Sequence, residues 1–207
     1  MTHADHLVYA APDLGAAVDE LATRTGVRPT PGGRHVRLGT HNALLALGPD
    51  IYLEIIAPDH EQPPPAMPRP FGLDTLTAPR LLTWALKVPD IDAHVAAARA
   101  AAYDPGVVTS MSRARPDGVR LEWRLTLTPR LQGDGLVPFL IDWGTTPHPA
   151  PHAAAGCVLI EFRGEHPEPA TVRPLLKALD AELPLSRGAA PALVATMDTP
   201  RGRVELR

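Results

Sequence analysis

The chain has 207 residues, of which 44% are hydrophobic and 21% charged, and its formal net charge is −3. These values are ordinary for a globular protein, so they exclude a disordered or fibrous chain. The weakly acidic balance, with three residues each of Trp, Tyr and Phe, disfavours a nucleic-acid-binding protein, which needs a basic face and stacking rings. A single cysteine, no apolar run of about 20 residues and no signal peptide together predict a cytoplasmic protein without a membrane span.

The first predicted elements are an apolar strand and an alanine-rich helix within residues 6–22. Asp13 stands where an N-cap residue accepts hydrogen bonds from the first helical amides. Two strands follow at 34–40 and 42–47, and a Gly-Pro-Asp turn then leads into a strand at 51–56. The pattern predicts a strand–helix–strand–strand–strand unit.

Residues 83–99 repeat this opening. Pro89-Asp90 aligns with Pro12-Asp13, an offset of 89 − 12 = 77 residues. After the second helix we expect strands at 107–115, 119–127 and 137–143. The same unit is therefore predicted twice, and the proline-rich stretch between the copies reads as a linker.

A third, shorter element closes the chain. It is predicted to contain a strand at 157–164, a helix at 169–183, and two strands at 192–198 and 203–207 joined by a turn. The predicted organisation is a first module at 1–57, a linker at 58–80, a second module at 81–150 and a C-terminal element at 151–207.

The segments DHLVYAAPDL, GGRHVRLGTHNALLALG and YLEIIAPD resemble the opening module of the vicinal oxygen chelate superfamily. The strand PFLIDWG and the closing TPRGRVEL are similar to its glyoxalase-like branch, which shares a fold with bleomycin-resistance proteins and extradiol dioxygenases. The resemblance implies an α+β fold. Paired βαβββ modules with curved, mostly antiparallel sheets would enclose a cavity, beside a smaller C-terminal βαββ element.

Strand alternation predicts which polar side chains line that cavity. Each strand has an apolar face suited to packing on a helix and a mixed face. The mixed faces carry His6, Tyr52, Glu54, Arg124 and Asp142. We therefore expect Tyr52 and Arg124 to bind substrate, Arg124 as a fork for a carboxylate or phosphate.

Other side chains are assigned by the same alternation. His35, next to a Gly-Gly pair, is expected to reach the cavity mouth and to contact substrate. Trp84, Phe139 and Trp143 are expected to pack between sheet and helix, outside the cavity. Arg113 is interpreted as part of a solvated hairpin tip.

The resemblance also implies metal ligands on the first and last strands of each module. Those positions are His6, Glu54, Thr83 and Asp142. An imidazole with carboxylates suits a divalent metal such as Zn, Mn, Ni, Fe or Mg. Thr83 departs from the pattern, because a neutral hydroxyl stands where a second histidine is usual.

Two functions stay open at this point. In a glyoxalase-type lyase or isomerase, a metal on His6, Glu54 and Asp142 would polarise a substrate oxygen, or Glu54 or Asp142 would act as the catalytic base. The alternative is a binding protein of the drug-resistance type that sequesters a small molecule without chemistry. Thr83 disfavours an extradiol dioxygenase, which needs two histidines and a carboxylate. The expected partner is a small-molecule ligand, and the chain is expected to be a monomer or a homodimer.

Overall fold

The computed structural model describes residues 3–36, 38–115, 117–128 and 130–207. The first module contains β1 (His3–Ala10), α1 (Leu14–Thr25), β2 (Thr30–His35), β3 (Thr40–Ala46) and β4 (Tyr52–Pro58). The second contains β5 (Arg80–Lys87), α2 (Ile91–Ala100), β6 (Val107–Ala114), β7 (Arg120–Leu127) and β8 (Phe139–Asp142). The C-terminal element contains β9 (Val158–His166), α3 (Pro169–Ala178), β10 (Leu185–Arg187), β11 (Ala192–Thr199) and β12 (Gly202–Leu206). Both βαβββ modules and the α+β class are thus confirmed.

The helix of each module begins where the sequence predicts. Asp13 Oδ1 accepts a hydrogen bond from Ala16 N at 2.7 Å, and Asp90 Oδ1 accepts one from Ala93 N at 3.0 Å. Such caps contribute about 1 kcal/mol each by satisfying amides that have no partner within the helix. The α1 helix ends at Gly26, whose φ of 79° needs a residue without a side chain.

The two modules share one curved sheet with the strand order β2-β3-β4-β1-β5-β8-β7-β6. The antiparallel pair β1–β5 joins the modules, and each of these strands is flanked by the parallel last strand of its own module. The edge strands β2 and β6 then approach each other, since Arg113 Nη1 of β6 donates to the Gly32 carbonyl of β2. The sheet therefore nearly closes around its concave face.

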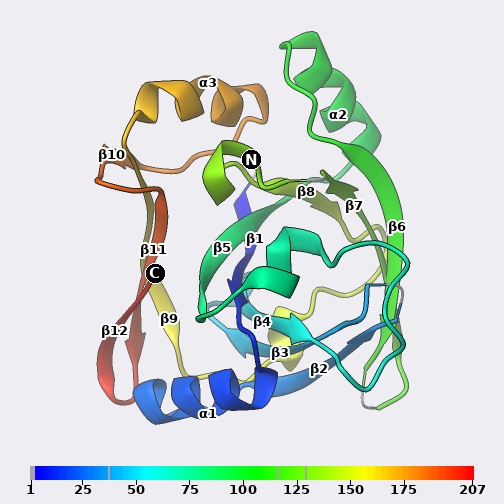
Figure 1. Cartoon of the computed structure of the whole chain (residues 1–207), viewed down its shortest axis with the longest axis vertical. Helices are drawn as coiled ribbons and strands as arrows, with labels where there is room; N and C mark the ends of the chain where they lie inside the picture. Colours follow the sequence, from blue (N-terminus) through cyan, green and yellow to red (C-terminus); the bar gives the residue numbers. More distant parts are fainter. Residues whose placement is uncertain (1–2, 37, 116, 129) are drawn as a thin grey trace.

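The convex face of this sheet is covered by α1 and by the second sheet, which has the order β10-β9-β11-β12 (Figure 1). Trp84 lies in this core at 1% exposure, and its Nε1–H donates to the Leu136 carbonyl at 2.9 Å. Its ring meets Phe162 of β9 edge to face at 5.4 Å. The predicted burial of Trp84 outside the cavity is confirmed, but its ring packs against the second sheet and not against a helix.

The C-terminal element differs from the prediction by one strand. β10 has three residues and pairs in parallel with the end of β9, so the element is βαβββ instead of βαββ. A strand this short has no alternation that could reveal it in the sequence. The chain end is held in place, because Leu81 N of β5 donates to the Arg207 carbonyl at 2.8 Å.

The segment between β4 and β5 crosses the open side of the curved sheet (Figure 1). It contains a short 3-10 helix, η1 (Pro70–Thr75). Arg69 fixes this helix by pairing with Asp74 at 2.6 Å and by donating from Nε to the Gly39 carbonyl at 2.7 Å. The linker thus covers part of the concave face.

No helix in the described part of the chain is long and apolar enough to cross a membrane.

Candidate active site

The concave face encloses a cavity of about 570 Å³, its open mouth included. Its two halves differ in chemistry. The first module contributes polar side chains, among them His6, His35, Asn42, Tyr52 and Glu54. The second module contributes mainly large apolar ones, Met111, Trp123, Leu125, Leu127, Phe139, Ile141 and Trp143, together with Arg113. A mostly apolar cavity with a few convergent polar groups is typical of a small-molecule site.

His6 is held between two carboxylates. Its Nδ1 lies 2.7 Å from Asp5 Oδ1, and its Nε2 lies 3.5 Å from Glu54 Oε2. The imidazole stacks on the ring of Tyr52, with centroids 4.7 Å apart and an interplanar angle of 19°. The hydrogen bond to Asp5 and the stacking on Tyr52 together fix the orientation of the His6 ring.

Asp5 is fully buried and accepts three hydrogen bonds. Besides His6, Trp143 Nε1 donates to Asp5 Oδ2 at 2.9 Å and His148 Nε2 lies 3.0 Å from the same oxygen. Burial raises the pKa of Asp5, but the hydrogen bonds from His148 and His6 and their charges outweigh it and hold that pKa well below its usual range. Asp5 is thus a carboxylate, so the His6 Nδ1 atom that faces it carries a hydrogen, and Nε2 is turned toward Glu54.

Glu54 is oriented from its other side by Asn42. Asn42 Nδ2 donates to Glu54 Oε1 at 2.6 Å across the β3–β4 pair. The Asn42 Oδ1 atom is buried without a hydrogen-bond partner among the described residues and lies against Gly32, where an added Cβ would come within 2.1 Å. Gly32 therefore leaves the room that the Asn42 amide needs to reach Glu54.

His35 and Tyr52 are neutral members of the cavity wall. Burial lowers the pKa of His35 to about 4, despite the opposing charge of Glu54. Its Nδ1 lies 3.0 Å from the Thr40 hydroxyl. Burial, with Asp5 and Glu54 nearby, raises the pKa of Tyr52 well above its ordinary value. His35 and Tyr52 therefore add shape and polarity to the cavity without adding charge at neutral pH.

Two predicted site residues lie elsewhere. Asp142 accepts hydrogen bonds from Gly144 N at 2.8 Å and from Ile91 N at 3.4 Å, on the side of β8 that faces α2. Arg124 pairs with Asp92 of α2 through two bonds of 2.8 Å and is exposed. Neither lines the cavity with His6 and Glu54, so the predicted convergence of these groups is wrong.

The same inversion moves aromatic side chains inward. Phe139 and Trp143, expected between sheet and helix, line the cavity, as does Trp123. Alternation separates the two faces of a strand but does not say which face is inside. In the second module the outer face of β7 meets solvent and carries the charges, so the apolar face lines the cavity.

Residues that sequence reasoning missed complete the site. Asp5 is the extra residue of a β-bulge in β1, because Ala4 pairs with Leu86 and His6 with the adjacent Ala85. In a regular strand neighbours point to opposite faces, and the bulge lets Asp5 contact His6. Arg113, interpreted as solvated, is 6% exposed and lines the cavity. No sequence signal marked either residue.

The donors present do not complete a metal site. His6 and Glu54 point into the cavity, and Asp5 supports His6 as an outer carboxylate often supports a metal-bound histidine. The second module adds nothing comparable, since neither Thr83 nor Asp142 lines this cavity. Among the described residues no group of three or more His, Cys, Asp or Glu could hold a metal ion. Two protein ligands fall short of the three or four that such sites use.

Comparison with known proteins assigns the chain to a protein family. The profile of a family described as a glyoxalase-like domain matches residues 4–179. The chain belongs to this glyoxalase-like domain family, which confirms the resemblance to the vicinal oxygen chelate superfamily. No curated protein matches the sequence.

Solved structures agree on the fold. A hypothetical protein from Staphylococcus aureus superposes with a TM-score of 0.66 at 14% identity, over 99% of this chain and 84% of that one. A methylmalonyl-CoA epimerase in complex with methylmalonyl-CoA and NH4+ gives 0.47 at 22% identity, over 72% and 99%. The epimerase from Mycobacterium tuberculosis gives 0.44 at 21% identity, over 67% and 86%. At 14% identity the similarity to the Staphylococcus aureus protein establishes the fold and not the reaction.

Proposed function

We propose that this protein is an isomerase or lyase that transfers a proton on a small oxygenated molecule, with His6 and Glu54 as its acid–base pair. The observation that carries the proposal is the placement of His6 Nε2 3.5 Å from Glu54 Oε2 on the cavity wall. Both groups are buried beside apolar rings, where a proton transfer is shielded from water.

The chemistry follows from how each group is held. Glu54 removes the proton from a carbon next to a carbonyl, and the electrons of that C–H bond move into the carbonyl to form an enolate. For this step His6 is the imidazolium, which donates Nδ1–H to Asp5 and Nε2–H to the developing oxyanion. The proton held by Glu54 then returns either to the same carbon, after exchange with solvent, or to the former carbonyl carbon of a 2-hydroxy ketone, whose hydroxyl proton passes to the other oxygen and completes the isomerisation. Asn42 keeps the Glu54 carboxylate in place, and no step uses a metal, because the ligand set is incomplete.

A second candidate is favoured by the aromatic half of the cavity. Rings without acid–base groups bind a flat apolar molecule and do no chemistry on it, as in a sequestering protein. The two candidates differ in turnover, since a sequestering protein holds its ligand unchanged.

The test measures exchange of carbon-bound hydrogen in D2O by proton NMR. The probes are 2-oxo acids, 2-hydroxy ketones and hemithioacetals, incubated with the wild type, His6→Asn and Glu54→Gln. We expect wild-type exchange at least tenfold above both variants for one probe class, and an unchanged rate in the matched control Asp142→Asn. Equal rates in wild type and Glu54→Gln across all classes would refute the proposed chemistry and favour sequestration.

A further inference from the structure

We infer that the ligand of this cavity is an aromatic carboxylate, bound through its carboxylate at Arg113 and through its ring by the aromatic wall. The inference names the substrate class of the site described under Proposed function and rests on that function for its chemistry. Its binding test is independent of turnover.

Arg113 is a buried cation without a carboxylate partner. Its Nη1 donates to the Gly32 carbonyl, and no other hydrogen bond or ion pair to it occurs among the described residues. A guanidinium has five N–H donors and stays charged at neutral pH. Burying such a charge is costly unless an anion pairs with it. Arg113 lines this cavity and also borders two more open hollows, and an anion in the cavity is the better shielded from water.

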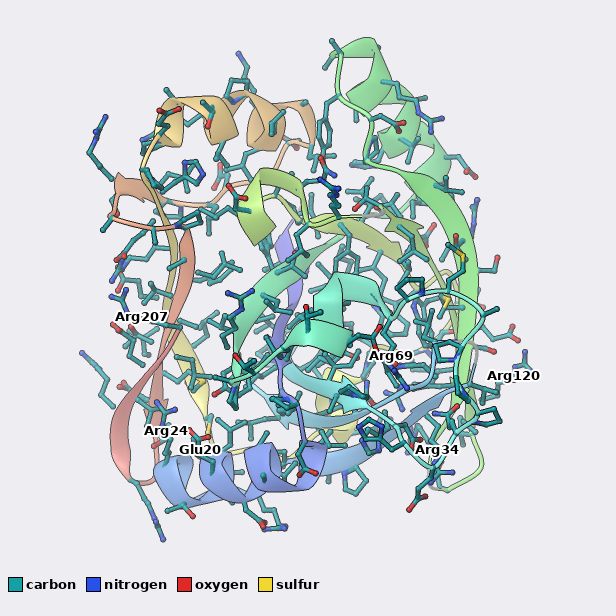
Figure 2. All side chains as sticks on the ribbon, viewed as in Figure 1. Glu20, Arg24, Arg34, Arg69, Arg120 and Arg207 are labelled. Carbon is teal, nitrogen blue, oxygen red and sulfur yellow. The ribbon has the colours of Figure 1, made fainter. Side chains whose placement is uncertain are left out.

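Neighbouring arginines contrast with Arg113. Arg34 and Arg120 reach the molecular surface at this edge (Figure 2), where Arg34 pairs with Asp59 at 3.2 Å and Arg120 with Glu122 at 2.9 Å. These two surface arginines each pair with an acidic side chain of the same chain. Arg113, which is buried, has no such pair among the described residues and can therefore pair with an anionic ligand.

The charge of the acid–base pair does not substitute for that anion. Glu54 lies within electrostatic range of Arg113, but its oxygens are engaged by Asn42 and His6. His35, a further basic group of the cavity, is held neutral by burial. Arg113 is therefore the group that orients the ligand. The carboxylate of the ligand binds at Arg113, and the rest of the ligand contacts the neutral rings.

The aromatic side chains of the cavity select for a ring. Five of the nine aromatic residues of the chain line the cavity: Tyr52, Phe71, Trp123, Phe139 and Trp143. Trp123 and Trp143 lie 5.3 Å apart, and Phe71 of η1 stacks on Phe139 at 5.9 Å. Aromatic pairs at such distances accept a further flat ring edge to face or offset.

Phe71 is placed at this wall at a conformational cost. Its φ of 62° and ψ of 12° are left-handed, a region that is unfavourable for a residue with a bulky side chain. The turn directs its ring onto Phe139 at the end of the cavity lined by η1. This strain is consistent with a position selected to contact a ligand.

The test is isothermal titration calorimetry of the full chain with 2-naphthoate. The comparison probes are 2-naphthalenemethanol, which lacks the charge, and cyclohexanecarboxylate, which lacks the ring. We expect 2-naphthoate to bind at least tenfold more tightly than either. Equal affinity for the acid and the alcohol, or no binding of 2-naphthoate, would overturn the inference.

Variants locate the anion. Arg113→Met should weaken 2-naphthoate at least tenfold and leave the alcohol unchanged, whereas the matched control Arg115→Met, which removes an arginine paired with Asp117, should change neither. If Arg113→Met does not fold, Arg113→Gln replaces it, keeps an N–H donor for the Gly32 carbonyl, and should lose the preference for the acid in the same way. An unchanged acid-to-alcohol ratio in the folded Arg113→Met protein would contradict the assignment.

A last comparison separates this inference from the proposed function. Glu54→Gln should bind 2-naphthoate within threefold of wild type while losing hydrogen exchange. Binding without any exchange in the wild type would leave the ligand class standing and reject the chemistry. Hydrogen exchange of a non-aromatic probe, without any binding of 2-naphthoate, would support the proposed chemistry and reject the ligand class.

Discussion

Glu54 and Phe139 occupy the same position in the two modules. Glu54 pairs in parallel with Val8, and Phe139 pairs in parallel with Ala85, which lies 85 − 8 = 77 residues beyond Val8. This offset is the one that relates the two Pro-Asp helix starts. The carboxylate of the first module is therefore matched by a phenyl ring in the second, and the cavity has one acid–base half and one aromatic half.

This asymmetry predicts weak metal binding. With His6 and Glu54 as the two inward donors, we expect much less than one equivalent of Zn2+ or Mn2+ per chain after dialysis, measured by elemental mass spectrometry. The control is His6→Ala, which should give the same low value. One full equivalent in the wild type that is lost in His6→Ala would show that further ligands complete the site.

Asp5→Asn should destabilise the protein by about 2–4 kcal/mol, because it removes a buried charge that accepts three hydrogen bonds. The folded-state pKa of Asp5 is depressed, so its contribution is complete above about pH 4 and is lost as the pH falls further. Urea unfolding from pH 7 to pH 3 should show a shallower acid-side loss in Asp5→Asn than in wild type. Identical pH profiles would contradict this account, and exposed Asp50→Asn is the control.

His35 should make stability depend on pH in a higher range. Its folded pKa of about 4 lies below the ordinary 6.5, so the unfolded chain binds a proton first as the pH falls. The contribution is present above about pH 6.5 and is lost toward pH 4, by roughly 3 kcal/mol in total. His35→Gln should flatten the urea-unfolding profile between these values. Exposed His152→Gln should keep the wild-type slope, and a wild-type slope in His35→Gln would refute the effect.

Gly32→Ala should displace Asn42 from Glu54. The new methyl group would lie 2.1 Å from Asn42 Oδ1, and forced rearrangement of a packed interior costs about 1–3 kcal/mol. In Gly32→Ala we expect both a lower thermal midpoint of unfolding and a slower exchange of the carbon-bound hydrogen of the probe than in the wild type. In the double variant with Asn42→Ala the stability costs should be less than additive, because the clash is gone. Full additivity would mean that the two residues do not interact.

Trp84 and Phe71 should separate stability from binding. Trp84→Ala should lower the free energy of unfolding by about 3–5 kcal/mol in urea, because it empties the core between the two sheets.

Phe71→Gly should change the free energy of unfolding by less than about 1 kcal/mol, since relief of the left-handed strain offsets the lost ring contact. It should nevertheless weaken 2-naphthoate several-fold in calorimetry. A large loss of stability with unchanged binding in Phe71→Gly would reverse this assignment.

Local rules in the sequence predicted much of the fold. The repeat of Pro12-Asp13 at Pro89-Asp90, the alanine-rich helices and the turn residues specify both βαβββ modules, because capping and turn formation depend on near neighbours. In β1 and β4 the alternation also placed His6, Tyr52 and Glu54 on one face. There the convex side is fully covered by protein, so the polar side chains face the cavity.

Tertiary structure decided the rest of the site. Whether the mixed face of β7 or β8 points inward depends on which side solvent reaches, and there Arg124 and Asp142 lie outside while Trp123 and Trp143 lie inside. A bulge brought Asp5 to His6, and the approach of two sheet edges buried Arg113. These features depend on contacts between residues far apart in the chain or on a local break in strand pairing. The period-two pattern of a single strand contains no information about either.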